Sequence, residues 1–206
     1  MTNPEAPPTP SIILASGSVH RARLLRDAGV PFEVIRPLVD EETARISLAA
    51  EGRTALDAAT VLAELKAIHI SQTNPDRLVL ASDQIMHCGG VWYGKAEDRD
   101  ALKQTLKTLS GSTHHLATAA VLFHGGQRIW HAGAQPALTM RSLSEASLDS
   151  YLAAAGEDIL SCVGGYQIEG LGVQLFSAIE GDLFSIQGLP LLPLLDILRL
   201  HKVLPQ

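Results

Sequence analysis

The chain has 206 residues, of which 46% are hydrophobic and 18% charged, and its formal net charge is −6. This length and composition predict a globular protein with a sizeable core and exclude a disordered chain. The negative charge argues against broad electrostatic binding to nucleic acid or to an anionic membrane. A small anionic ligand therefore requires positive side chains that are concentrated in one place.

The N-terminal residues 1–10 are rich in proline and lack the basic and apolar regions of a signal peptide. We interpret them as a flexible tail that precedes a single domain over 11–206. No apolar stretch reaches the ~20 residues that a membrane-spanning helix needs. Cys88 and Cys162 are isolated and lack the spacing of metal ligands, which is typical of a reducing compartment. We expect a cytoplasmic protein that contacts no membrane.

The first predicted strand and helix are joined by a loop of small residues. The apolar residues 12–15 break into Ser16-Gly17-Ser18, and a helical pattern that carries Arg21 follows. Main-chain N–H groups at the helix start, two hydroxyls and a guanidinium together suit an anion, and phosphate is the natural candidate. In the alternative interpretation, Ser18 only caps the helix. This segment alone favours neither.

The next segments alternate between strand and helix patterns. Residues 31–35 predict a half-buried strand, residues 39–42 an acidic loop, and residues 54–72 the clearest helix of the chain. Three apolar residues share one face of this helix, with a lysine beside them: Leu62, Leu65, Ile68 and Lys66.

An apolar strand over 78–81 is expected to stop at Ser82-Asp83-Gln84. The later elements are expected to be a helix over 98–109, a hairpin of strands near 115–123 and 128–140, a helix capped by Ser144 that runs to about 154, and a last helix over 188–200. This alternation predicts an α/β fold with a mixed sheet.

Two acidic residues are candidates for catalysis. Asp83 follows an apolar strand, and ligands gather at the carboxyl ends of strands in α/β folds. A carboxylate there can bind a metal ion or accept a proton from water. Glu41 offers a second hard oxygen ligand for Mg²⁺. In the alternative interpretations, Asp83 opens a turn and Glu41 belongs to a solvated acidic loop.

Two lysines are candidates for binding phosphate. Lys66 lies in an otherwise apolar part of its helix, and Lys95 follows Gly94, which permits close approach of the backbone. An ammonium group acts on phosphate as a point charge. In the alternative interpretation, both lysines extend their charged ends into solvent.

Glu169 lies in a glycine-rich segment, residues 164–172, that can line a pocket. The glycine spacing is not that of a dinucleotide-binding loop, and the Walker A, G-x-S-x-G and zinc motifs are absent. No His/Asp partnership identifies Ser16 or Ser18 as a nucleophile.

Taken together, these segments resemble the Maf family, whose members are also called septum formation inhibitor proteins. The matching blocks follow the family order over residues 11–200: LASGS at 14–18 with Arg21 and LL at 24–25, VDE at 39–41, LAELKA at 62–67, ASDQ at 81–84, GK at 94–95, LSGSTH at 109–114, GGY at 164–166 and GLP at 188–190. The resemblance implies nucleoside triphosphate pyrophosphatase activity and an inosine-triphosphatase-like α/β fold with an elongated mixed sheet flanked by helices.

The resemblance also implies roles for individual residues and a divalent cofactor, Mg²⁺ or Mn²⁺. Asp83 matches the proton acceptor and, with Glu41, the metal-binding position. Arg21, Lys66 and Lys95 match basic positions around the triphosphate. Ser16 and Ser18 of the first loop are further residues expected to bind the substrate. Hydrolysis between the α- and β-phosphates by direct attack of water would release a nucleoside monophosphate and pyrophosphate. A homodimer is plausible from the family resemblance, and no nucleic acid partner is expected.

Three positions are associated with base choice in this family, and here they are His20, Gln84 and Glu169. The branch that acts on dTTP and UTP has Arg, Thr and Gln there, whereas the branch that acts on 7-methyl-GTP has Trp, Gln and Glu. The second branch matches at Gln84 and Glu169, and His20 matches neither. A carboxylate at 169 suits the two N–H donors on the edge of guanine. We therefore expect 7-methyl-GTP or a similar modified nucleotide as substrate.

Two alternatives are kept open. One is a pyrophosphatase of the dTTP/UTP type. The other is a regulator of cell division that binds a nucleotide without turning it over. Asp83 argues against the second alternative, because a protein that only binds needs no base.

Overall fold

A computed structural model describes residues 12–206, and the tail expected over residues 1–10 lies outside this range. The described strands are β1 (Ile12–Leu14), β2 (Phe32–Val34), β3 (Leu78–Cys88), β4 (Val91–Tyr93), β5 (Thr113–His124), β6 (Gln127–Ala134), β7 (Ala137–Met140) and β8 (Phe176–Glu180). The helices are α1 (Val19–Asp27), α2 (Glu41–Ala50), α3 (Ala55–Thr73), α4 (Arg99–Leu109), α5 (Glu145–Ala154), α6 (Leu183–Ile186) and α7 (Leu191–Leu200). Short 3₁₀ segments cover Asp158–Ser161 and Leu171–Leu175.

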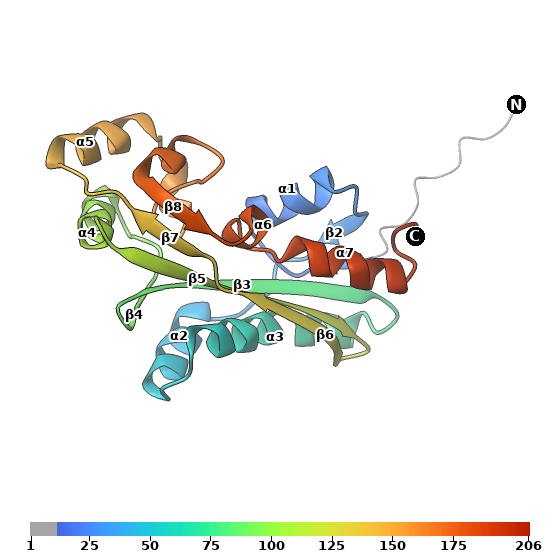
Figure 1. Cartoon of the computed structure of the whole chain (residues 1–206). Coiled ribbons are helices and arrows are strands. Elements are labelled where there is room, and N and C mark those ends of the chain that lie inside the picture. Colours follow the sequence, from blue (N-terminus) through green and yellow to red (C-terminus); the bar gives the residue numbers. More distant parts are fainter. Residues whose placement is uncertain (1–11) are drawn as a thin grey trace, which may run out of the picture.

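The strands form one mixed sheet whose main path runs β2-β1-β3-β5-β7-β8. β1 pairs in parallel with β2 and β3, whereas the other pairings are antiparallel. Helices α2 and α3 cover one face of the sheet, α1, α6 and α7 cover the other, and α4 and α5 lie at one end (Figure 1). The predicted α/β fold, with an elongated mixed sheet between helices, is confirmed.

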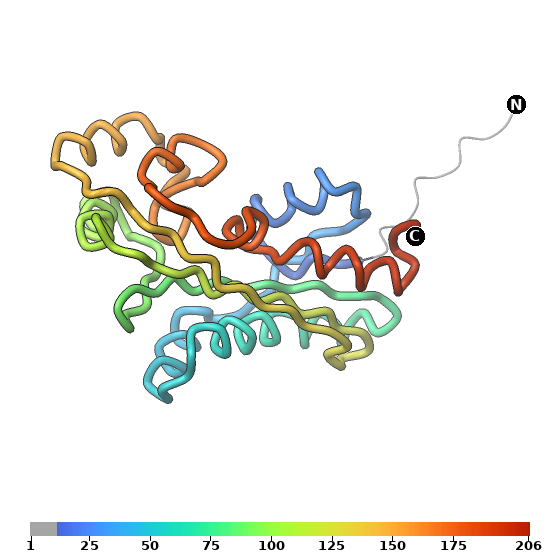
Figure 2. Tube along the Cα trace, in the orientation of Figure 1, coloured from blue at the N-terminus to red at the C-terminus, as the bar shows by residue number. Residues whose placement is uncertain are grey.

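The chain ends of the described fold meet on one face of the sheet. Figure 2 shows the early segment that contains α1 beside the late segment that contains α6 and α7. Leu24 and Leu25 of α1 belong to the same buried cluster as Leu191 and Leu194 of α7. The first loop of the chain and the turn between α6 and α7 are therefore held close together.

Strand β3 is apolar at its start because helices cover both of its faces. Leu78 and Leu80 pack in the cluster under α1 and α7, whereas Val79 and Ala81 pack in the cluster under α3. Successive side chains of a strand point to opposite faces. Asp83 therefore shares the α3 face with Ala81, whereas the residues on either side of Asp83 point to the other face.

Helix α3 lies against the sheet through small side chains. Its buried positions include Ala59, Ala63 and Ala67, which permit close approach of the helix to β3. The expected apolar face was wrong in part, because Leu65 and Ile68 are 41% and 39% exposed. The alanines bury a face turned away from both residues.

Two element boundaries differ from the predictions. The acidic loop expected over residues 39–42 ends at Asp40, whose side chain accepts a hydrogen bond from Thr43 N at 3.1 Å and caps α2, which begins at Glu41. The strand expected over 128–140 is two strands, β6 and β7. They are separated at Pro136, which cannot donate a main-chain hydrogen bond to a neighbouring strand.

The strand predicted to stop at Asp83 continues to Cys88, so this aspartate lies in the middle of β3. The sequence pattern hid this extension because polar residues interrupt the apolar run. The last helix begins at Leu191 rather than at residue 188, and neither α6 nor β8 was predicted. Within residues 12–206, no helix has both the length and the apolar character needed to cross a bilayer.

Two leucines of α3 test this packing. Leu62 is 1% exposed and Leu65 is 41% exposed. Replacing Leu62 with Ala should lower the free energy of unfolding by about 2–5 kcal/mol, because it removes buried methyl groups and leaves a cavity. The matched change Leu65→Ala should alter this free energy by no more than about 0.5 kcal/mol. Urea denaturation measures both, and equal losses would contradict the burial of one face.

Candidate active site

The candidate site is a cleft of about 670 Å³ beside the middle of β3. β1 pairs with β3 over residues 78–80 and β4 pairs with it over residues 86–88. Between these pairings, residues 81–85 are bonded within the described sheet to β5 alone. All of the residues predicted for the site line this one cleft: Ser16, Ser18, His20, Arg21, Glu41, Lys66, Asp83, Gln84, Lys95 and Glu169.

A buried lysine joins two of these carboxylates. Lys66 is 4% exposed, and its Nζ lies 2.6 Å from Asp83 Oδ1 and 2.8 Å from Glu41 Oε2. A buried ammonium is tolerated only when its charge is paired and its donors are satisfied. Lys66 therefore ties α3 to β3 and to the first turn of α2. The interpretation of Lys66 as a solvent-exposed side chain is wrong.

Arg21 is also buried, and it braces the first loop against the turn after α6. Its Nε donates to the Gly188 carbonyl at 2.8 Å, and Nη1 lies 3.4 Å from Ser16 Oγ. Burial lowers the pKa of Arg21, and the charges of Asp83 and Glu41 oppose this effect. A guanidinium keeps its proton at neutral pH even so.

The serines of the first loop organise its backbone. Ser18 caps α1 by accepting a hydrogen bond from Arg21 N at 3.4 Å, and Ser16 Oγ accepts one from Ser18 N at 3.1 Å. The capping role expected in the alternative interpretation is therefore present. Because Ser16, Ser18 and Arg21 also line the cleft, this capped helix start faces the space where a ligand would lie.

Gly188 is required at the turn that Arg21 contacts. Its φ is +101°, and a Cβ added there would lie 3.3 Å from Arg21 Nε. The Gly188 carbonyl also accepts a hydrogen bond from Ser82 Oγ at 2.8 Å. A side chain at this position would strain the backbone and crowd the guanidinium at once.

Gln84 fixes the end of α6, directly before this turn. Its Nε2 donates to Thr118 Oγ1 at 2.7 Å and lies 3.0 and 3.1 Å from the carbonyls of Ser185 and Ile186. These contacts orient the amide, so the oxygen of Gln84 remains the atom that a ligand can use as an acceptor.

Further cations line the cleft. Lys95 is exposed in the loop after β4, and its role at the cleft was predicted. Arg36 and Arg45 were missed. Arg36 directly follows the predicted strand 31–35, and Arg45 lies one helical turn after Glu41. Both positions in the sequence could therefore have indicated a place near the site. Arg45 pairs with Glu42 at 2.6 Å and is held at the edge of the cleft.

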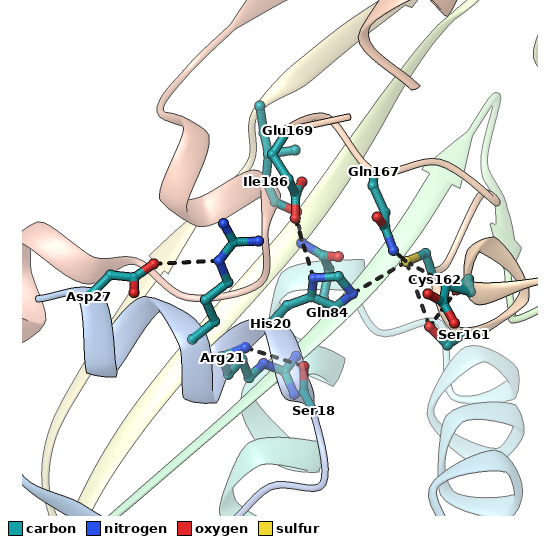
Figure 3. Close-up of polar contacts among 12 residues, drawn as sticks. Ser18, His20, Arg21, Asp27, Gln84, Ser161, Cys162, Gln167, Glu169 and Ile186 are labelled. Atoms are coloured by element: carbon teal, nitrogen blue, oxygen red, sulfur yellow. Dashed lines mark hydrogen bonds and ion pairs between the residues drawn. The ribbon is translucent and has the colours of Figure 1, made fainter. Parts of the chain in front are cut away.

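Elsewhere in the lining of the cleft, an imidazole lies between a carboxylate and a thiol (Figure 3). His20 Nδ1 is 3.3 Å from Glu169 Oε1, and its Nε2 is 3.6 Å from Cys162 Sγ. The hydrogen bond with Cys162 raises the pKa of His20, burial opposes this, and the charges of Cys162 and Glu169 add to the rise. Cys162 was not predicted for the site, because 142 residues separate it from His20.

The glycine-rich loop that carries Glu169 is anchored in the core. His114 Nε2 lies 2.7 Å from the Tyr166 hydroxyl, and both residues are buried. Burial lowers the pKa of His114 to about 4, so this imidazole is neutral at physiological pH. A neutral ring can hold the tyrosine without placing a charge in the core.

The donor set at Lys66 fits a divalent cation. Glu41 and Asp83 direct carboxylate oxygens at one positive group, and Mg²⁺ is commonly held by one or two carboxylates together with substrate phosphates. Within residues 12–206, no cluster of three or more His, Cys, Asp and Glu side chains is arranged to hold a metal ion. An ion held by Glu41 and Asp83 would take its other ligands from substrate and water.

Comparison with known proteins agrees with this arrangement. The family model described as "Maf-like protein" matches residues 11–201. A nucleoside triphosphate pyrophosphatase of Rhodospirillum rubrum is 54% identical over 95% of this chain and 96% of its own length. A 7-methyl-GTP pyrophosphatase of Brucella abortus is 41% identical over 94% of this chain and 98% of its own length. The resemblance found in the sequence is confirmed, and the chain belongs to the Maf-like protein family.

Proposed function

We propose that this chain is a hydrolase that cleaves a nucleoside triphosphate between its α- and β-phosphates. The observation that carries the proposal is the cleft beside β3, where the Lys66 ammonium lies between the carboxylates of Asp83 and Glu41. Relatives similar over nearly their whole length are nucleoside triphosphate pyrophosphatases. The products are a nucleoside monophosphate and pyrophosphate.

In the proposed reaction, Asp83 accepts a proton from the water that attacks the α-phosphorus. The bond from that phosphorus to the bridging oxygen breaks, and pyrophosphate leaves. Arg21, Lys66 and Lys95 balance negative charge on the triphosphate, the first two from buried positions where electrostatic interactions are stronger. Ser16 and Ser18 line the same cleft, Ser16 Oγ lies 3.4 Å from Arg21 Nη1, and both hydroxyls bind phosphate oxygens in this proposal.

Glu41 and Asp83 are the residues that would hold a divalent cation, Mg²⁺ or Mn²⁺. When bound, such an ion supplies Lewis-acid charge that polarises phosphoryl oxygens. Asp83 has two carboxylate oxygens, one of which contacts Lys66. The second oxygen is therefore the one open to an ion or to the attacking water.

For the base, we propose a modified guanine such as that of 7-methyl-GTP. Glu169 Oε1 is near His20, which leaves the second oxygen of this carboxylate for the N–H donors of a guanine edge. The carboxylate also favours the positive charge that methylation places on the ring. Uracil and thymine present a single N–H on that edge and use this group less well.

Changing Asp83 to Asn should lower kcat by about 10²–10⁴-fold, because the amide cannot accept the proton from water. Release of pyrophosphate from 7-methyl-GTP with Mg²⁺ measures this loss. The control Asp76→Asn changes an exposed aspartate in the turn before β3 and should leave kcat unchanged. Turnover that persists in Asp83→Asn, or release of orthophosphate by the unmodified protein, would contradict the mechanism.

Changing Glu169 to Gln should reduce kcat/KM for 7-methyl-GTP about tenfold more than for UTP, because it removes a charged hydrogen-bond acceptor from the guanine edge. The two substrates are compared on the same variant, so a general disturbance of the cleft lowers both values together. Equal losses on the two nucleotides would count against recognition of the base by Glu169.

A further inference from the structure

A thiol, an imidazole and a carboxylate form a chain on the wall of the cleft that carries Glu169. Cys162 Sγ lies 3.6 Å from His20 Nε2, and His20 Nδ1 lies 3.3 Å from Glu169 Oε1 (Figure 3). Cys162 is half-buried and lines the cleft directly after a 3₁₀ segment. It is therefore within reach of small molecules that enter the cleft.

This order of groups is the one that activates a cysteine. A base within hydrogen-bond reach takes the thiol proton, and an acceptor on the other ring nitrogen holds the imidazole in position. Two further groups support the sulfur, since Gln167 Nε2 and Ser161 Oγ each lie 3.9 Å from it. The cluster draws its members from α1, from the end of the 3₁₀ segment and from the glycine-rich loop.

The electrostatic surroundings agree with this geometry. Burial opposes ionisation of Cys162, but the hydrogen bond and charge of His20, with hydrogen bonds from Ser161 and Gln167, bring the pKa of the thiol below its usual value. Cys162 also interacts electrostatically with two tyrosines, Tyr151 of α5 and Tyr166 of the glycine-rich loop. Burial raises the pKa of both hydroxyls, so these tyrosines stay neutral over the range in which a thiol ionises.

We propose that Cys162 is a modification site, a nucleophilic thiolate paired with His20 that reacts with small disulfides and soft electrophiles entering the cleft. With a disulfide, the Cys162 sulfur attacks one sulfur atom, a new S–S bond forms and the old one breaks. The other half leaves as a thiolate and takes the proton held by His20. The adduct then occupies the cleft and excludes nucleotide. The exclusion of nucleotide from the cleft rests on the proposed function, whereas the reactivity of the Cys162 thiol does not.

Alkylation of the full chain by iodoacetamide, followed by mass spectrometry of the two cysteine peptides, tests the reactivity. Cys88 is the internal control, because it is also half-buried and its thiol donates to the Thr113 carbonyl at 3.5 Å. At about pH 7, Cys162 should react at least ~10-fold faster than Cys88, since an ordinary thiol is only a few per cent ionised there. Equal rates would overturn the proposal.

The variant His20→Asn separates activation from mere exposure. Asn can keep a hydrogen bond to Glu169 but has no atom at the position of Nε2. In this variant the Cys162 rate should fall at least ~10-fold at about pH 7, whereas the unmodified chain should retain its Cys162 rate to lower pH than the variant does. An unchanged Cys88 rate shows that the fold is intact. An unchanged Cys162 rate would overturn the proposal.

Exclusion of nucleotide is tested with oxidised glutathione as the disulfide. Treatment should lower kcat/KM at least ~10-fold, dithiothreitol should restore it, and Cys162→Ser should not respond to the disulfide. Full turnover by the adduct would overturn exclusion. If the unmodified protein turns over no nucleotide, the proposed function fails by itself, and the alkylation contrast still decides whether the thiol is activated.

Discussion

The ion pairs of the buried Lys66 ammonium are the interaction on which the part of the cleft proposed to bind phosphate depends. Removed from water, this charge needs partners, and it finds them in Asp83 from β3 and Glu41 from α2. Loss of one member of the buried pair Lys66–Asp83 costs about 3–5 kcal/mol, because the remaining charge is left without compensation, whereas Glu41 is half exposed and contributes less. The same contact that stabilises three elements also sets two carboxylate oxygens side by side. Stability and the geometry of the proposed chemistry therefore have one physical origin.

Successive side chains of β3 point to opposite faces of the sheet, so this strand presents groups on both sides beside the cleft. Asp83 points toward α3 and meets Lys66. Ser82 and Gln84 point to the opposite face, where Gln84 holds the end of α6 and Ser82 the turn that follows it. β1 has already ended and β4 has not yet begun beside this stretch. The unpaired edge leaves room for a ligand, and the strand supplies the proposed catalytic Asp83 and the proposed base-selective Gln84 from adjacent positions.

Sequence patterns predicted the helices and strands well where interactions between neighbouring residues determine them. Ser144 caps α5 as expected, because a hydroxyl before a helical pattern satisfies a free N–H group. The face of α3 was predicted less well, since Leu65 and Ile68 follow helical spacing but α3 packs through its alanines. Family motifs brought the predicted site residues together, whereas the contact of Cys162 with His20 depends on tertiary folding and on a loop without regular structure. No spacing in the sequence carries that information.

A proton can move from Cys162 to His20 without changing the total charge of His20, Glu169 and Cys162. If His20 and Cys162 are both neutral, the three groups carry the single negative charge of Glu169. If the proton moves from sulfur to imidazole, the new positive and negative charges cancel and the total is the same. After a disulfide adduct forms and His20 loses its proton, these three groups again total the charge of Glu169, to which any charge on the adduct itself is added. The attraction proposed for a cationic base is therefore not removed by the reaction of the three groups themselves, and the proposed exclusion of nucleotide rests on the volume of the adduct.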